Sequence, residues 1–242
     1  MSPATNSASN GNRLLASLGS SDIGLLRPDL EACEFKLNQP MEEPDRPIRY
    51  VYFPDAGIIS VTAAANGDRE IEIGIIGREG GTGGAITLGN DRSPHKTYVQ
   101  VAGNGQRITA DKFRRALNKS ESFRLLMMKS VAAFNVQTAH TAVANARGHL
   151  EERLARWLLM AHDRIDGDEL ALTHEFLAIM LAVRRSGVTT ALQEFVRKGH
   201  IKAGRGVITI LDREALEQIA NSYYGTPERE WKRLMSESRS SR

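Results

Sequence analysis

The sequence has a single cysteine and no long apolar run. With Cys33 alone, an internal disulfide, a cysteine-ligated zinc site and a cysteine-ligated iron–sulfur cluster are excluded, which suits a reducing cytoplasm. No segment approaches the roughly 18 consecutive apolar residues of a membrane span, so we expect a soluble protein without a membrane partner. Residues 1–12 lack the basic start and apolar centre of a secretory signal, and we interpret them as a disordered tail.

The overall composition is that of an ordinary globular protein, with 41% hydrophobic and 25% charged residues in 242 positions. Such a chain can form one large or two modest domains. The net charge of only +3 permits nucleic-acid binding without arguing strongly for it. The distribution is more informative, because one short segment opposed only by Glu194 collects Arg184, Arg185, Arg197, Lys198, Lys202 and Arg205. We predict a basic surface there, the alternative being a solvated helix face.

Two kinds of hydrophobic periodicity divide the first half of the chain. Residues 13–34 carry apolar residues at helical spacing, broken by Pro28, and predict short helices. The period then changes to that of strands, which we expect at residues 50–53, 58–63, 71–76, 97–101 and 106–108. The intervening residues 54–57, 66–67 and 103–105 are interpreted as turns, Asn66-Gly67 being a strong hairpin signal because both residues tolerate positive φ. Closely spaced strands with tight turns indicate an antiparallel roll or barrel.

A helical region follows the predicted strands. Thr109 or Asp111 can cap a short helix that ends near residue 118, and a longer helix is expected at residues 121–147. In the longer helix, apolar residues recur at intervals of three and four, which is typical of a coiled-coil seam. The seam residues are Leu125, Met128, Ala132, Val136, Ala139, Val143 and Ala146. They could pack on the roll of the same chain or on a second copy, and we favour a homodimer because so long a helix needs a large apolar partner.

The segment that decides the functional prediction is residues 172–201. Gly148 interrupts the long helix as a candidate hinge, and a second amphipathic run over residues 150–161 precedes the segment. Thr173 can cap a helix whose inner face is Phe176, Leu177, Met180 and Leu181. A second helix begins near Arg184, with Val188, Ala191, Leu192, Phe195 and Val196 facing inward.

The outward residues of this second helix are suited to DNA. They are Arg184, Arg185, Ser186, Thr189, Thr190 and Gln193. Arginine can contact guanine through two hydrogen bonds, and serine and threonine can reach phosphates or bases. Residues 201–211 then read as two small strands around a Gly-rich turn, a basic wing whose Lys202 and Arg205 can contact the phosphate backbone.

The helix pair resembles the helix-turn-helix of Crp/Fnr-type transcription regulators, and the order of elements over residues 13–225 is similar as well. The resemblance rests on the segment T-H-E-F-L-A-I-M-L-A-V-R-R-S-G-V-T-T-A-L, residues 173–192, and on V-Y-F-P-D-A-G-I-I-S, residues 51–60, which is similar to a mostly uncharacterised branch of the family. It implies that Arg185 is the principal base-reading residue. Ser186 and Thr190 replace an acidic residue and a second arginine, which implies an operator unlike the Crp consensus.

The sensor half departs from family members that bind cyclic nucleotides. In those members a glutamate holds the ribose, and an Arg-Ser or Arg-Thr pair holds the cyclic phosphate. Depending on register, Thr82 replaces that glutamate or Glu79 is displaced, and His95 or Lys96 replaces the arginine. Cyclic nucleotide binding is therefore doubtful, although Glu79, Gly80, Gly81, Thr82, His95 and Lys96 remain the candidate effector pocket. The Gly-rich run could form an anion-binding nest or simply be a structural turn.

No residue set supports catalysis or a metal site. The histidines are scattered without a nucleophile and an orienting acid, so we expect no enzyme. His162, Asp163, Asp166 and Asp168 lack a regular ligand face and are interpreted as a solvated helix end. Cys33 is not set in a cluster of positive charge, which makes a redox-sensing thiol a weak alternative.

These observations predict an α+β protein of four parts. The parts are a disordered tail (1–12), an antiparallel β-roll sensor domain like the cyclic-nucleotide-binding jelly roll (13–120), a dimerisation helix (121–147) and a winged helix-turn-helix domain (148–242). The predicted function is a bacterial, cytoplasmic, homodimeric transcription regulator that binds a palindromic site in double-stranded DNA, without an assigned cofactor and with RNA polymerase as a partner to consider. The alternative is a cyclic-nucleotide-binding module that acts through protein contacts.

Overall fold

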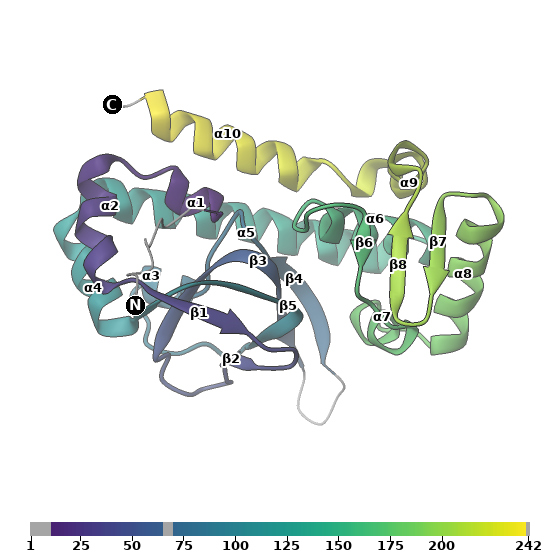
Figure 1. Cartoon of the computed structure of the whole chain (residues 1–242), viewed down its shortest axis with the longest axis horizontal. Helices are drawn as coiled ribbons and strands as arrows, with labels where there is room; N and C mark the ends of the chain where they lie inside the picture. Colours follow the sequence, from purple (N-terminus) through teal and green to yellow (C-terminus); the bar gives the residue numbers. More distant parts are fainter. Residues whose placement is uncertain (1–10, 65–69, 241–242) are drawn as a thin grey trace, which may run out of the picture.

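The computed structural model describes residues 11–64 and 70–240. Its first part is a roll of antiparallel strands with short helices at one end (Figure 1). Strand β5 is central, because β1, β2 and β3 all pair with it, and β4 pairs with the other edge of β3. The elements are α1 (Arg13–Ala16), α2 (Ser20–Leu26), the 3-10 turn η1 (Arg27–Asp29), β1 (Glu31–Phe35), β2 (Pro40–Glu42), β3 (Tyr50–Ala63), β4 (Ile71–Ile76), α3 (Gly84–Thr87) and β5 (Lys96–Thr109).

The predicted roll is confirmed, but two of its predicted turns are wrong. Residues 54–57 lie inside β3 and residues 103–105 lie inside β5, so each pair of expected strands is one long strand. The pairing between β3 and β5 shifts register around Ala56, which marks bulges where a turn was expected. Glycine is needed there because Gly57 has φ +90° and a Cβ on Gly103 would lie 2.2 Å from the Ala56 carbonyl oxygen. The predicted Asn66-Gly67 hairpin turn lies outside the described residues.

The N-terminal predictions need two corrections. Asn12, assigned to the tail, is buried, and its side-chain amide donates to the carbonyl oxygens of Pro54 and Gly80 at 2.8 and 2.9 Å. It also caps α1 by accepting from the Leu15 amide. Short helices do form after residue 13, but residues 31–34 belong to β1 rather than to a helix because they pair with the bulged end of β5. Burial raises the pKa of the Cys33 thiol on β1 to about 11, the opposite of what a reactive thiolate needs.

Helix α5 (Glu121–Arg147) runs along the roll and has the predicted bounds. It follows α4 (Ala110–Lys119), and Ser120 caps it by accepting from the Phe123 amide. Phe123, Leu126 and Met127 bury one of its faces in the roll. At Gly148 the chain turns into α6 (Leu150–His162), as the sequence predicted.

The remaining elements form a compact unit at the far end of α5 (Figure 1). Its core joins α6, the two helices after it and a small sheet through Leu158, Leu177, Leu192, Phe195 and Ile208. In this sheet β8 lies between β6 and β7. The elements are β6 (Glu169–Leu170), α7 (His174–Met180), α8 (Arg185–Arg197), β7 (Ile201–Gly204), β8 (Val207–Ile210), α9 (Arg213–Ala220) and the 3-10 turn η2 (Asn221–Tyr223).

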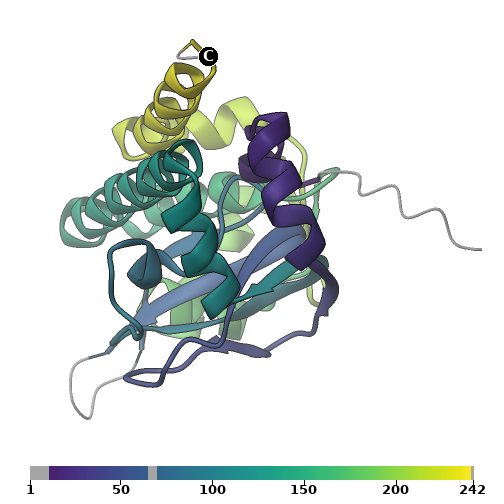
Figure 2. The ribbon, with the colours of Figure 1, turned by 90° about the vertical axis from the view of Figure 1, so that its left-hand side faces the viewer.

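The last helix leaves this unit and returns to the first domain. Helix α10 (Thr226–Ser240) lies alongside α5 in both views of the ribbon (Figures 1 and 2). Met235, Trp231 and Leu234 join the core of the roll and its helices. The predicted domain of residues 148–242 is therefore too long at its C-terminal end, because α10 packs on the sensor domain. Within the described residues, no helix combines the length and apolarity needed to cross a bilayer.

Candidate nucleic-acid interface and sensor cavity

Helices α7 and α8 cross at a tight turn that sets the exposed face of α8. Thr173 caps α7 by accepting from the Phe176 amide, as predicted. The turn is closed by Ala182, whose φ of +51° is unusual for a residue with a Cβ. Helix α8 then begins with Arg184 as its N-cap. Val188, Ala191, Leu192 and Phe195 bury its inner face, whereas Val196, also predicted to face inward, is 43% exposed.

The outer face of α8 carries most of the predicted side chains. Arg184, Arg185, Ser186, Thr190 and Gln193 are exposed. Arg185 keeps 68% of its side chain exposed, and its only ion pair among the described residues is a long one of 4.0 Å to Glu175. Thr189 differs from this group because it is half-buried, and its hydroxyl contacts His174 Nδ1 on α7 at 3.0 Å. The N-terminal part of the helix therefore presents the free polar groups.

The wing is formed by β7 and β8. Ile201, Ile208 and Ile210 attach it to the core, and Lys202 and Arg205 are exposed beside the turn at Gly206, which has φ +76°. The basic surface is partly neutralised at the C-terminal end of α8, because Glu194 pairs with Arg197 at 2.7 Å and with Lys198 at 3.2 Å. Hydrogen bonds from these two cations lower the pKa of Glu194 to about 2. Among the described residues, the cations at the start of α8 and on the wing have no ion pair as short as these.

The seam of α5 points away from the rest of the chain. Leu125, Met128 and Val143 are 50%, 46% and 49% exposed, and the other seam residues are exposed or half-buried. The faces that pack on the roll and on α10 use other positions, such as Leu126, Met127 and Phe134. Packing of the seam on its own roll, the alternative interpretation, is therefore wrong. The described chain leaves this apolar stripe without a partner.

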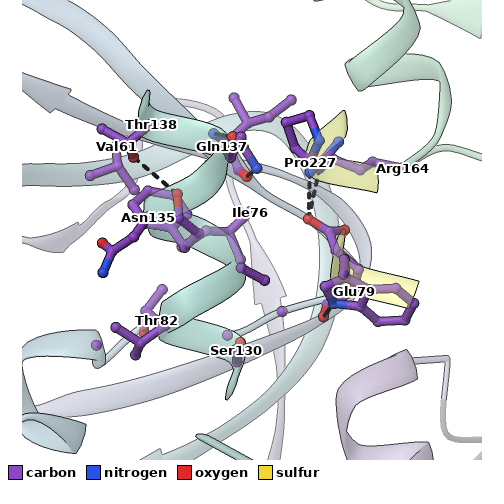
Figure 3. Close-up of a pocket in the computed structure, with 18 of the residues that line it drawn as sticks. Val61, Ile76, Glu79, Thr82, Ser130, Asn135, Gln137, Thr138, Arg164 and Pro227 are labelled. Carbon is purple, nitrogen blue, oxygen red and sulfur yellow. Dashed lines mark hydrogen bonds and ion pairs between the residues drawn. The ribbon is translucent and has the colours of Figure 1, made fainter. Parts of the chain in front are cut away.

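A cavity of about 680 Å³ lies between the roll, the Gly-rich segment and α5, with α10 along its rim (Figure 3). Apolar side chains such as Val61, Ile76 and Phe134 form much of its wall. Of the predicted pocket residues, Glu79, Gly80, Gly81, Thr82 and His95 line it, whereas Lys96 does not and instead pairs with Glu70 at 2.9 Å. Thr82 is buried and its hydroxyl oxygen accepts from the Tyr52 amide at 2.9 Å, so this side chain stabilises the roll.

The sequence analysis missed an acidic residue in this cavity. Glu42 at the end of β2 is only 8% exposed, and its Oε1 accepts from the Gly83 amide at 2.9 Å. Burial raises the pKa of Glu42, while the hydrogen bond from Gly83 partly opposes that rise. No local pattern marks Glu42, because only the pairing of β2 with β5 brings it to the Gly-rich segment.

The Gly-rich segment is also tied to the second domain. Glu79 pairs with Arg164, just beyond α6, at 2.7 Å, and both side chains are largely buried (Figure 3). Arg78 pairs with Asp166 at 2.7 Å. From α10, the Trp231 indole donates to the Glu79 carbonyl oxygen at 3.0 Å. The cavity wall therefore contacts both the turn that leads into the helix-turn-helix and the helix that follows it.

A second link between the domains is a buried carboxyl group. Glu72 on β4 accepts from the Trp157 indole of α6 at 2.6 Å and from the Ser60 hydroxyl at 2.7 Å. Burial raises the pKa of Glu72 to about 7, although these hydrogen bonds and the nearby Arg156 lower it. Ile58 and Ile75 of the sheet share the hydrophobic core of the second domain around this carboxyl group. The sheet is thus docked against α6.

The acidic and histidine residues near the end of α6 form an ion-pair network. His162 contacts Asp168 through Nε2 at 2.9 Å and Arg213 through Nδ1 at 2.8 Å. Arg213 also pairs with Asp163 at 2.8 Å. Among the described residues no group of three or more potential ligands is arranged to hold a metal ion.

The second domain matches a known protein family. Residues 152–219 fit the family model of the Crp-like helix-turn-helix domain. In its fold and in this domain, the chain is of the Crp/Fnr type. The transcriptional regulator SdrP of Thermus thermophilus is 34% identical over 83 residues, which are 32% of this chain and 41% of SdrP. The aligned part thus spans about two fifths of that curated relative.

Solved structures extend the Crp/Fnr-type fold to the sensor half. A protein from Eubacterium rectale assigned to the Crp/Fnr family superposes with a TM-score of 0.67 at 20% identity, over 88% of this chain and 100% of that chain. A CRP-family transcriptional regulator from Thermus thermophilus superposes with a TM-score of 0.65 at 19% identity, over 78% and 97%. At these identities the likeness establishes the β-roll and C-terminal helix-turn-helix of the Crp/Fnr type as a fold.

Proposed function

We propose that this chain is a homodimeric, sequence-specific DNA-binding transcription regulator and not an enzyme. The observation that carries the proposal is the exposed N-terminal face of α8, where the Arg185 side chain is 68% exposed and only loosely paired with Glu175, beside the cationic wing. A helix with such an exposed polar face can enter the major groove, where the wing can contact the adjacent phosphates. We place the protein in the cytoplasm of a bacterium, where RNA polymerase is a further candidate partner.

The α5 seam supplies the second half of the proposal. An isologous contact between two seams would bury Leu125, Met128 and Val143, which are about half exposed in the single chain. Because α5 leads directly through Gly148 into α6, pairing of two seams would place two recognition helices at a fixed separation. Such a dimer would read a palindromic operator, one half-site per α8.

The residues of the interface divide into two roles. Arg185 is the proposed base-reading residue, with Ser186 and Thr190 as auxiliaries at the exposed start of α8. Arg184, Gln193, Lys202 and Arg205 are assigned to the sugar–phosphate backbone. Thr189 contributes less, since its hydroxyl already contacts His174.

The test begins with selection of bound sequences from a random duplex pool, followed by anisotropy titrations of variants. Arg185→Ala should weaken binding to the selected site by about 1–3 kcal/mol and leave random DNA nearly unaffected. Lys202→Ala, the matched control, should weaken binding to the selected site and to random DNA alike. It should also reduce the slope of the binding constant against salt concentration, on logarithmic scales, by about one released counterion. Equal losses on both duplexes for Arg185→Ala would refute the base-reading role. Absence of any DNA binding, together with tight binding of a cyclic nucleotide, would favour the alternative of a cyclic-nucleotide module.

A further inference from the structure

The Gly-rich segment of the sensor domain already has an acidic partner. In a Gly-rich turn, backbone N–H groups are the groups that hold an anion. Here the Gly83 amide donates to the carboxyl of Glu42, and the Thr82 amide donates to the Tyr52 carbonyl oxygen at 2.9 Å. The carboxyl group therefore takes a position at which an anionic ligand would be bound.

The charges around the cavity reinforce this point. On the side of the cavity formed by the roll and its Gly-rich segment, the charged or titratable lining residues include Glu42, Glu79 and His95. Lys96 lies outside the lining and is paired with Glu70. Cations of other elements also line the cavity: Arg164 and Arg213 are paired with Glu79 and Asp163, whereas Arg13 of α1 and Lys232 of α10 are exposed. A phosphate placed against the Gly83 amide would therefore face the Glu42 carboxylate.

The second oxygen of Glu42 has spare hydrogen-bonding capacity. Its Oε1 accepts from the Gly83 amide, but among the described residues Oε2 has only a long contact of 3.5 Å with the Thr97 hydroxyl. Burial raises the pKa of this carboxyl, which means that its ionised form is poorly stabilised by the chain alone. A hydrogen-bond donor with a positive charge is the group that would compensate for this burial.

Part of the cavity wall is apolar, although Ser130, Asn135 and Thr138 of α5 also line it. Ile73, Ile76, Val131 and Phe134 face a cavity of about 680 Å³, which is within the range of small-molecule sites. This apolar part of the wall fits a hydrocarbon body.

We propose that this cavity is an effector site for an apolar molecule that carries an amine, with Glu42 as the residue that binds the amine. The ligand would place its hydrocarbon part against the wall made by β4 and α5 and donate from its ammonium group to Oε2 of Glu42. The same carboxylate would disfavour the anionic group of a cyclic nucleotide or a fatty acid at the Gly83 amide. Calling the ligand an effector rests on the proposed function. Its binding to the cavity can be measured without DNA.

The test uses three probes with the same hydrocarbon chain, n-decylamine, n-decanol and n-decanoate, together with cyclic AMP, in calorimetric titrations of the full chain. Decylamine should bind most tightly, decanol more weakly, and decanoate and cyclic AMP not measurably. Glu42→Gln keeps an oxygen for Gly83 and should weaken decylamine binding by about tenfold or more, because a charge-assisted hydrogen bond becomes a neutral one. The same variant should change decanol binding by less than about threefold.

Two control variants make the result decisive. Glu43→Gln removes the same charge from the exposed neighbouring position and should leave all four titrations unchanged. Gly84→Leu, whose Cβ would lie 3.6 Å from Val131 in the wall, should fill part of the cavity and weaken decylamine and decanol together. Similar affinity for all three ten-carbon probes, unaffected by Glu42→Gln, would mean nonspecific apolar binding and would overturn the proposal, as would tighter binding of decanoate or cyclic AMP.

Failure of this inference and failure of the proposed function are distinguishable. If decylamine binds through Glu42 but the chain has no affinity for DNA, the cavity assignment stands and the regulator assignment fails. If the chain binds a selected duplex but decylamine does not bind, the regulator assignment stands and the cavity assignment fails.

Discussion

The buried carboxyl of Glu72 makes the stability of this protein depend on pH in an unusual direction. Glu72 is fully enclosed between the sheet and α6, where it accepts from Trp157 and Ser60. Its pKa is raised from 4.5 to about 7, chiefly because burial disfavours the carboxylate. Between these two pH values the unfolded chain has released the proton, while the folded chain still holds it.

The sign follows from this difference in bound protons. As the pH rises from about 4.5 to 7, the folded state must either hold a proton that the unfolded chain has lost or bury a charge, so stability falls. Below 4.5 the group contributes no penalty, and above 7 the penalty is complete. With about 1.4 kcal/mol for each pH unit, the shift from 4.5 to about 7 corresponds to about 3 kcal/mol.

The perturbation is Glu72→Gln, which has the same shape and no titration. Its side-chain oxygen can still accept from Trp157, so at pH 4.5 the free energy of unfolding should differ from that of the parent by less than about 1 kcal/mol. At pH 8 the variant should be more stable than the parent by about 3 kcal/mol. Urea unfolding followed by tryptophan fluorescence at both pH values gives the comparison, with Glu43→Gln as an exposed control. A parent-minus-variant difference that is the same at both pH values would refute the reasoning.

Two further predictions concern the helix-turn-helix. Ala182 has φ +51° in the turn between α7 and α8, so Ala182→Gly should raise the stability of the protein by up to about 1 kcal/mol, as measured by urea unfolding; a lower stability would contradict the assigned strain. Glu194 neutralises Arg197 and Lys198 on the surface, so Glu194→Gln should strengthen binding to random DNA and leave the stability of the protein nearly unchanged. Anisotropy at two salt concentrations checks the second prediction, and unchanged affinity at low salt would contradict it.

The features that sequence could predict are those set by local periodicity and capping. The bounds of α5 follow from its spacing of apolar residues and from the interruption at Gly148. The Thr173 cap and the inner face of α8 were also predictable, because neighbouring turns of one helix decide them. Val196 was assigned wrongly because it lies at the end of α8, where the helix has passed the edge of the core.

The features that were missed depend on contacts between distant segments. The bulges near Ala56 and Gly103 arise from the pairing of β3 with β5, so each resembles a turn when its strand is considered alone. Glu42 reaches the cavity only through the pairing of β2 with β5. Helix α10 was not predicted, and nothing local indicates that its residues Trp231, Leu234 and Met235 pack on the sensor domain.

The most direct test of the central claim is the mass of the chain in solution, measured by sedimentation equilibrium with and without charges in the seam. The account predicts that the parent has twice the chain mass of 26.7 kDa. It predicts that the double variant Leu125→Glu and Val143→Glu has the mass of one chain and binds the operator more weakly. The matched double variant Leu37→Glu and Ile71→Glu, at positions 61% and 41% exposed outside the seam, should remain dimeric. A monomeric parent, or a seam variant that keeps the double mass, would contradict the account.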